Sequence, residues 1–251
     1  MLIDTHAHIC DKSFDADRTL VIQRACAAGV KRIIAVGENM DDAVGNLELA
    51  GKHPELLSAA GLYPLYAEPA AAEEMYEFIR QNKSKLAAIG EVGLDFHRVK
   101  DDAEKELQKK VLEGFAELSL ELDIPINVHS RSAGRQAVSL LLEKGVKKAQ
   151  LHAFDGKAGS ALPGAEAGYF FSIPPSVVRS RQKQKLVRRL PLSCILVESD
   201  SPVLGPDHQK RNEPANCIAA LEMIASIKNI PIEQAAETIR ENTSRLYGAV
   251  V

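Results

Sequence analysis

The chain opens with Leu2-Ile3-Asp4-Thr5-His6-Ala7-His8-Ile9, an apolar segment that predicts a short β-strand with two histidines at its end. Successive side chains of a strand point to opposite faces, so His6 and His8 fall on the same face. Two neutral imidazoles in that arrangement can bind one metal ion together. The same pair is also compatible with two partly buried polar residues, so its meaning depends on whether the pattern recurs.

Short apolar runs of this kind recur, and they alternate with helical patterns along the whole chain. The predicted strands are Leu2–Ile9, Arg32–Val36, Leu57–Gly61, Leu86–Glu91, Pro125–His129, Ala149–His152, Tyr169–Ile173 and Cys194–Ser199. The predicted helices are Asp17–Ala28, Asp42–Gly51, Glu73–Gln81, Ala103–Leu122, Ala133–Glu143, Gly159–Ala167, Ser180–Arg189, Pro214–Ile227 and Ile232–Glu241. Eight strands, each followed by a helix, predict an α/β protein with a (β/α)₈ TIM-type barrel. A doubly wound open sheet is the structural alternative.

Length and composition narrow the class of protein. The chain has 251 residues, 45% of them hydrophobic and 26% charged, and we expect a single domain over residues 1–251 because no linker interrupts it. The net charge of −3 gives no indication of a nucleic-acid or membrane partner, so an anionic substrate would have to be held by a local binding site. We find no signal peptide, no apolar run long enough to span a membrane and no disulfide-like cysteine pattern. These features predict a cytoplasmic protein with no obligate protein partner.

Polar residues gather at the carboxyl ends of the predicted strands, the face on which barrels carry their active sites. They are His6 and His8 after the first strand, Glu91 after the fourth, His129 after the fifth, His152 after the sixth and Asp200 after the eighth. Four of the seven histidines of the chain therefore end an apolar strand. A single metal site would explain why all of these residues lie at equivalent positions.

The ligand set divides between two divalent ions. His6, His8 and Asp200 suit one ion, His129 and His152 suit a second, and Glu91 can bridge the pair, because a carboxylate relieves the repulsion between neighbouring cations. Two divalent ions carry four positive charges, and Glu91 and Asp200 supply two negative ones. The excess positive charge favours a hydroxide nucleophile and an anionic substrate. Imidazole-rich ligation suits Zn, Mn, Fe, Co or Ni better than Mg, although the carboxylates leave Mg open.

Several motifs together resemble the TatD family of metal-dependent hydrolases, within the amidohydrolase superfamily. They are Asp4-Thr5-His6-Ala7-His8, Ile89-Gly90-Glu91-Val92-Gly93-Leu94-Asp95, Val128-His129-Ser130-Arg131, Leu151-His152-Ala153-Phe154-Asp155-Gly156, Glu198-Ser199-Asp200-Ser201-Pro202 and Asn212-Glu213-Pro214. They occur in the family's order from Asp4 to about Tyr247, which is nearly the whole chain. Any one motif would be weak, whereas the ordered set is specific.

The resemblance implies a TIM-type barrel and a divalent-metal deoxyribonuclease, usually with 3′→5′ exonuclease character. It implies metal binding by the same six residues, and it implies that Asp200 also handles the proton of the attacking water. Arg131 looks like a phosphate clamp, since a guanidinium can bind phosphate through two hydrogen bonds, although a surface or capping role is the alternative. The family usually has Gly-x-His-Pro where this chain has Gly61-Leu62-Tyr63-Pro64. Tyr63 is therefore a candidate substrate-binding residue that can donate a hydrogen bond but carries no positive charge.

One further feature is a basic run that follows the seventh strand. The 179–189 basic run consists of Arg179, Arg181, Lys183, Lys185, Arg188 and Arg189. Barrel phosphate sites often use this loop region, and such a run could guide a nucleic-acid backbone. A solvated helix face is an equally good interpretation.

The preferred hypothesis is a phosphodiester hydrolase in which a hydroxide bridging two metal ions attacks a phosphate of single-stranded DNA or a short nucleic acid. In it Asp200 and Glu91 are catalytic. A metal-dependent hydrolase of a small amide, lactone or ester is the second hypothesis, and a non-catalytic binding protein built on the barrel is the third. The change Arg131→Ala separates the first two, because only an anionic substrate needs that guanidinium.

Overall fold

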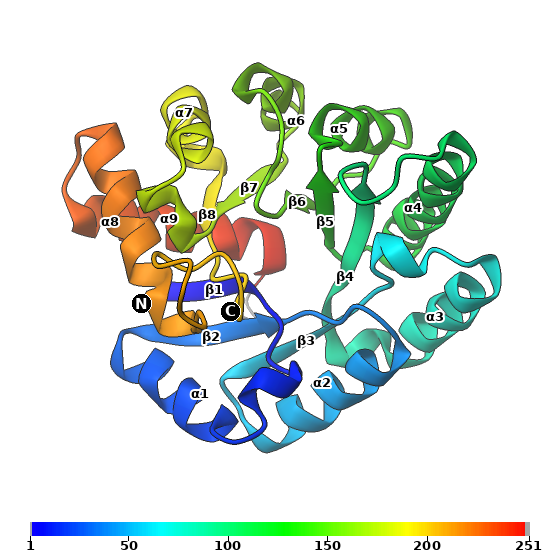
Figure 1. The fold of residues 1–251 in the computed structure, drawn as a ribbon, viewed down its shortest axis with the longest axis horizontal. Coiled ribbons are helices and arrows are strands. Elements are labelled where there is room, and N and C mark those ends of the chain that lie inside the picture. Colours follow the sequence, from blue (N-terminus) through cyan, green and yellow to red (C-terminus); the bar gives the residue numbers. More distant parts are fainter. Residues whose placement is uncertain (1, 249–251) are drawn as a thin grey trace.

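The computed structural model describes residues 2–248 and shows eight parallel strands arranged in a ring, with helices around the outside (Figure 1). The strands are β1 (Leu2–Ala7), β2 (Val30–Ala35), β3 (Leu56–Ala60), β4 (Leu86–Asp95), β5 (Ile126–Arg131), β6 (Ala149–Leu151), β7 (Phe170–Ile173) and β8 (Ile195–Val197). Each strand pairs with the next one in sequence, in the order β1 to β8. The predicted (β/α)₈ barrel is confirmed, and the open-sheet alternative is wrong.

Most of the helices lie around the outside of the barrel (Figure 1). The helices are α1 (Arg18–Ala27), α2 (Met40–Lys52), α3 (Pro69–Asn82), α4 (Asp102–Leu122), α5 (Gly134–Glu143), α6 (Leu162–Glu166), α7 (Arg181–Arg189), α8 (Cys217–Lys228) and α9 (Ile232–Tyr247). The longest of them, α4, begins where the Asp101 side chain accepts hydrogen bonds from the backbone N–H groups of Ala103 and Glu104. Within residues 2–248, every helix is too short or too polar to cross a bilayer.

Two hydrophobic clusters stabilise the barrel. The larger one lies between the strands and the surrounding helices, and it contains strand residues such as Ile33 and helix residues such as Phe115. The smaller one contains Ile34 and Leu196 together with Leu246 and Tyr247 from the end of α9. In Figure 1, α9 lies behind the ring of strands. The last helix therefore contributes apolar side chains to a second core, and the opposite end of the barrel is left for the polar residues.

The ring is completed where β8 meets β1, and the residues just beyond β8 make this connection. The backbone N–H of Asp200 donates to the carbonyl of His6 at 2.9 Å, and the N–H of His8 donates to the carbonyl of Ser201 at 2.9 Å. Because these two bonds join the segments that carry three of the predicted ligands, the closure of the barrel also fixes the spacing of those ligands.

The fourth strand differs from its prediction. It was expected to end at Glu91 but continues to Asp95, so Glu91 lies inside a ten-residue strand and not at its end. Gly93 makes the extension possible: its φ is +149°, and a Cβ atom there would lie 2.1 Å from the carbonyl oxygen of His129. The close approach of β4 to β5 brings Glu91 and His129 into contact. Periodicity alone does not show this, because a polar residue that faces the barrel interior interrupts the apolar run as a residue beyond the strand would.

Candidate metal centre

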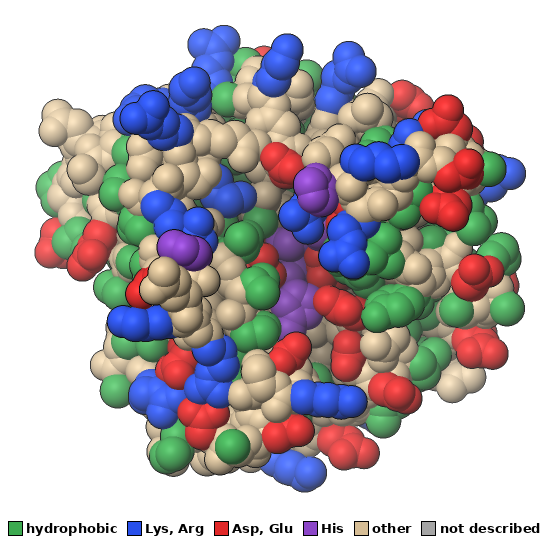
Figure 2. All heavy atoms as spheres, viewed as in Figure 1, with side chains coloured by type: hydrophobic (Ala, Val, Ile, Leu, Met, Phe, Trp, Pro, Cys, Tyr) green, Lys and Arg blue, Asp and Glu red, His purple; other side chains and the backbone are tan. Residues whose placement is uncertain are grey.

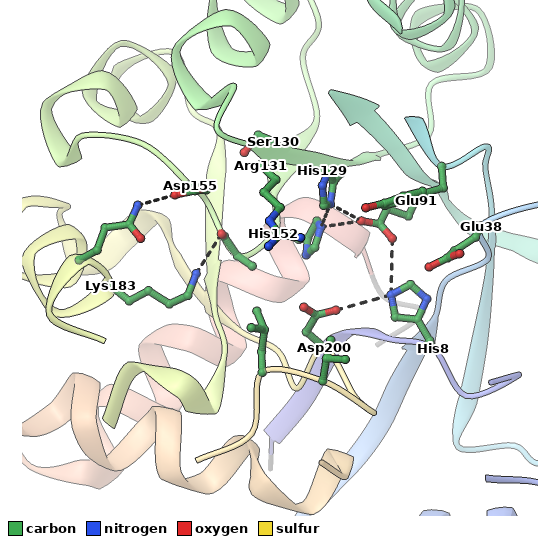
Figure 3. Close-up of a pocket in the computed structure, with 15 residues that line it drawn as sticks. His8, Glu38, Glu91, His129, Ser130, Arg131, His152, Asp155, Lys183 and Asp200 are labelled. Carbon is green, nitrogen blue, oxygen red and sulfur yellow. Dashed lines mark hydrogen bonds and ion pairs between the residues drawn. The ribbon is translucent and has the colours of Figure 1, made fainter. Parts of the chain in front are cut away.

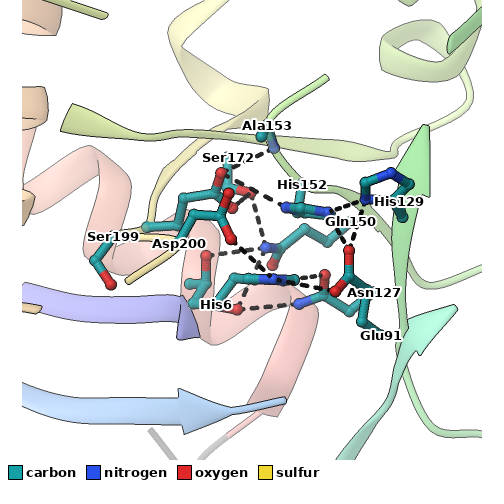
Figure 4. A network of polar contacts seen from close by, with 12 residues as sticks. His6, Glu91, Asn127, His129, Gln150, His152, Ala153, Ser172, Ser199 and Asp200 are labelled. Carbon is teal, nitrogen blue, oxygen red and sulfur yellow. Dashed lines mark hydrogen bonds and ion pairs between the residues drawn. The ribbon is translucent and has the colours of Figure 1, made fainter. Parts of the chain in front are cut away.

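The six predicted ligands come from five strands or the loops that follow them, and they meet at one end of the barrel (Figures 3 and 4). His6 lies in β1, Glu91 in β4 and His129 in β5. His8 and His152 directly follow β1 and β6, and Asp200 lies in the loop after β8. Four of the six are buried, while His8 and His129 are partly open to a pocket. The sequence-based prediction that these side chains lie together agrees with this geometry.

One group of donor atoms forms around His6, His8 and Asp200. The two Nε2 atoms of the histidines lie 3.3 Å apart, and each lies 3.5 Å from Oδ1 of Asp200. Glu91 Oε2 lies 3.5 Å from His8 Nε2 and 3.9 Å from His6 Nε2. A tetrahedral site with bonds of about 2.0–2.2 Å has ligand atoms about 3.3–3.6 Å apart. The spacing of this group therefore fits a bound divalent ion.

A second group forms on the other oxygen of the same carboxylate. Glu91 Oε1 lies 2.7 Å from His129 Nδ1 and 2.8 Å from His152 Nε2, and these two nitrogens are 3.1 Å apart. Thus each oxygen of Glu91 faces one of the two ligand groups. His6, Glu91 and His152 can also group around one ion, so the division of ligands that the sequence suggested stays a prediction.

The barrel interior orients His6 through a chain of hydrogen bonds (Figure 4). The Asn127 amide Nδ2 donates to the carbonyl of Thr5 at 3.0 Å, so its Oδ1 is turned toward His6 Nδ1, also at 3.0 Å. This contact requires the proton of the imidazole to be on Nδ1 and leaves the Nε2 lone pair facing the cluster. A hydrogen bond made by the ring nitrogen that points away from the metal is typical of histidines that bind metal ions.

His129 is held from the far side by Asp95, a residue that the sequence-based site did not include. The Asp95 Oδ2 atom lies 3.4 Å from His129 Nε2 and accepts a hydrogen bond from the Tyr63 hydroxyl at 3.1 Å. Its other oxygen accepts from the backbone N–H groups of His97 and Arg98. The Asp95 carboxylate is therefore fixed by three donors and faces a candidate ligand, and Tyr63 reaches the site through it. Its place in the motif that ends at Asp95 could have indicated this role.

Glu38 is a second residue that the sequence-based site missed. It follows β2, lines the same pocket and can group with His8 and Glu91 as possible ligands. The signal was present in the sequence, because Val36-Gly37-Glu38 is one more apolar strand followed by a carboxylate.

The charges of this cluster are strongly coupled. Burial lowers the pKa of His8, but the Asp200 and Glu91 carboxylates outweigh burial and raise it to about 9. Burial would raise the pKa of Glu91, but the charges of His152 and His129 outweigh burial and hold it well below its ordinary value. The pKa values of His129 and His152 are also raised, so protons on these rings and on His8 balance the carboxylates in the metal-free protein. Burial lowers the pKa of His6 to about 4, so that ring stays neutral. A cation bound to the same atoms would take the place of the protons.

The cluster forms the floor of a pocket of about 500 Å³. Its walls include Tyr63, Arg131, Asp155 and Lys183, and the Arg131 side chain extends toward His152 (Figure 3). On the face that carries the pocket, histidines lie at the bottom of a hollow (Figure 2). Lys and Arg side chains gather over α5, α6 and α7, whereas Asp and Glu are more frequent over α3 and α4.

The family model described as TatD related DNase matches residues 3–248 of this chain. The chain therefore belongs to the TatD family. In keeping with this membership, it is a metal-dependent hydrolase that acts on ester bonds. The resemblance that the sequence motifs suggested is confirmed.

Individual relatives cover nearly the whole chain. The human protein named deoxyribonuclease TATDN3 is 42% identical, over 98% of this chain and 94% of its own length. A Bacillus subtilis protein named uncharacterized metal-dependent hydrolase YabD is 32% identical over 98% of this chain and 99% of its own. Among solved structures, the TatD homologue YjjV of Escherichia coli superimposes with a TM-score of 0.91 at 25% identity, covering 99% of this chain and 98% of that one.

Proposed function

We propose that this protein hydrolyses phosphodiester bonds of DNA, with 3′→5′ exonuclease character, at a site that holds two divalent ions. The observation that carries the proposal is the placement of Glu91, whose two oxygens face two separate groups of ligands. His6, His8 and Asp200 would hold one ion, and His129 and His152 the other. A carboxylate shared between neighbouring cations is typical of sites that cleave phosphodiesters.

The chemistry that such ions supply is Lewis-acid activation of the phosphate and of a water molecule. The donor set of imidazoles and carboxylates fits Zn, Mn, Co or Ni, and its carboxylates leave Mg possible. Glu91 and Asp200 supply two negative charges against four from a pair of divalent ions. The excess positive charge favours an anionic substrate.

The chain's own residues have distinct tasks in this proposal. Asp200 Oδ1 lies at the pocket floor, 3.5 Å from both His6 and His8, where it can accept the proton of an attacking water. Arg131 is exposed at the pocket wall with its guanidinium directed inward, so it can bind two phosphate oxygens. Tyr63 lines the pocket beside Asp95, where its ring can contact the substrate.

Nucleic acid is the proposed substrate for two reasons. The human relative, 42% identical, is named a deoxyribonuclease. In addition, the Lys and Arg side chains over α5 to α7 form a positive edge beside the pocket (Figure 2). A strand whose 3′ end enters the pocket could lie along this edge, because such contacts follow the phosphate backbone regardless of base.

The test uses metal-stripped protein with single-stranded DNA labelled at the 5′ or the 3′ end, and Mg, Mn, Zn, Co or Ni added in turn. We expect a ladder of products that shortens from the 3′ end with at least one metal. The variants Asp200→Asn and His129→Ala should lose most turnover while keeping the fold by circular dichroism. Full activity in both variants would contradict the proposed site.

A second candidate function is hydrolysis of a small amide, lactone or ester. The size of the pocket favours it, because about 500 Å³ is typical of small-molecule sites. The change Arg131→Ala should cripple cleavage of an anionic phosphodiester and leave a neutral ester almost unaffected. No DNA cleavage with any metal, in a protein that still binds two ions, would favour this second function.

A further inference from the structure

One member of the 179–189 basic run differs from the others in its surroundings. Five of the six residues are exposed, whereas Lys183 is buried, with 8% of its surface accessible. It lines the pocket, and its amine is directed from α7 toward the centre, on the side opposite Glu38 (Figure 3). The helix thus places one cation of the run inside the site.

The ammonium group of Lys183 has capacity for further hydrogen bonds. Within residues 2–248 its one hydrogen-bond acceptor is the carbonyl of Ala153, 3.0 Å from Nζ, and no carboxylate oxygen lies within 4.0 Å of it. An ammonium has three N–H donors, so two remain free. A buried charge that has no counter-charge is costly, and proteins normally pair it.

The nearby carboxylates are occupied by neutral donors. Asp155 accepts from the Gln182 amide at 2.8 Å and from the Ser132 backbone at 2.9 Å. Glu198 accepts from the Ala153 backbone at 2.8 Å and from the Ser172 hydroxyl. They therefore stabilise the positive charge of Lys183 from a distance without using its protons. Burial lowers the pKa of Lys183, and the charges of Glu198, Asp200 and Asp155 oppose this shift.

We propose that Lys183 binds a phosphate oxygen of the substrate and, after cleavage, of the phosphate-bearing product. This inference rests on the proposed function and adds to it a residue that makes the site specific for phosphate over neutral esters. Arg131 approaches from the open wall, whereas Lys183 provides a compact charge within the pocket. The two cations together would hold an anion above the cluster of candidate ligands.

The experiment must distinguish phosphate binding by Lys183 from a purely structural role of this residue. Ala153 follows the candidate ligand His152 and has a left-handed φ of +38°, so the bond from Lys183 to its carbonyl could simply hold this turn. Loss of that bond would disturb His152 and hence metal binding. Loss of a phosphate contact would leave metal binding intact.

The experiment measures binding of inorganic phosphate to the metal-loaded protein by calorimetry, together with metal content and thermal stability. Lys183→Gln removes the charge but keeps an N–H donor for Ala153, and Lys183→Met serves if that variant fails to fold. Lys183→Arg keeps the charge. Lys110→Gln, at an exposed lysine of α4 away from the pocket, is the control.

We expect Lys183→Gln to weaken phosphate binding about tenfold or more with unchanged metal content, as for a lost charge-assisted hydrogen bond. Lys183→Arg should restore part of the affinity, and the control should match wild type. Unchanged phosphate affinity in Lys183→Gln, loss of metal in that variant, or a wild-type protein that binds no phosphate would each overturn the inference. Phosphate binding that depends on Lys183 in a protein that cleaves no phosphodiester would instead support the inference and contradict the proposed function.

Discussion

The Tyr63 hydroxyl donates a hydrogen bond to Asp95 at 3.1 Å, and the same carboxylate oxygen faces His129 at 3.4 Å. A tyrosine at the position where the family usually has histidine therefore reaches a candidate metal ligand through one intermediate carboxylate. Because burial and the neighbouring Glu91 and Asp95 carboxylates raise the pKa of Tyr63, its hydroxyl stays protonated and remains a donor.

The first prediction follows from this contact. Tyr63→Phe removes the donor but keeps the ring, so Asp95 should hold His129 less firmly. We expect metal affinity to fall about tenfold, which is the lower end of the loss caused by mutating residues that hold metal ligands in place. Competition with a fluorescent chelator measures this. An unchanged metal affinity combined with a raised KM would show that Tyr63 acts on the substrate directly.

The second prediction concerns the carboxylate between the two ligand groups. Glu91→Gln keeps the size of the side chain but removes the negative charge that both groups share. We expect metal content to fall to one ion or fewer per chain and turnover to fall roughly hundredfold or more. Elemental analysis after dialysis gives the content. Glu117→Gln, on the exposed face of α4, is the control, and two retained ions in Glu91→Gln would refute the shared role.

The third prediction is that metal binding releases protons. The pKa of His8 in the metal-free protein is raised to about 9, and those of His129 and His152 are also raised. Below these values an ion must displace protons from the imidazoles. Affinity should therefore rise with pH up to about pH 9, by about tenfold per pH unit for each proton released. Calorimetry in buffers of different ionisation enthalpy counts those protons, and an affinity independent of pH would contradict the expectation.

The fourth prediction tests the contact between β4 and β5. Gly93→Ala places a Cβ atom 2.1 Å from the His129 carbonyl oxygen, so the strands must separate. We expect a loss of about 2–4 kcal/mol in the free energy of unfolding, together with weaker metal binding. Gly145→Ala is the control, because Gly145 also has positive φ but has nothing within 4 Å. Equal losses in the two variants, measured by urea unfolding, would show that backbone strain alone is responsible.

The sequence predicted the barrel and the meeting of six side chains because both follow from a general rule. Parallel strands joined by helices bring their carboxyl ends together, so His6 and Asp200 could be placed near each other without coordinates. The end of β4 was misplaced because a carboxylate within a strand resembles a carboxylate that follows one. Only the register between β4 and β5 shows that Glu91 faces inward.

The contributions of Asp95 and Lys183 could not be predicted in the same way. Asp95 meets His129 because the two strands approach at Gly93, a contact that no pattern within one segment reveals. Lys183 is one of six similar residues, and its burial depends on how α7 is rotated against the barrel. The family pattern suggests that Tyr63 meets substrate, whereas its hydrogen bond to Asp95 is visible only in three dimensions.

The closure of the ring between β8 and β1 has a consequence for synthesis and turnover of the chain. The candidate ligands His6 and His8 are made before Asp200, which is added only after the eighth strand. An ion that binds all three would join the first and last strands at the junction where the segment beyond β8 hydrogen-bonds to His6 and His8. We therefore expect a truncated chain to lack the intact site, and we expect loss of metal to accelerate hydrogen exchange first at this junction.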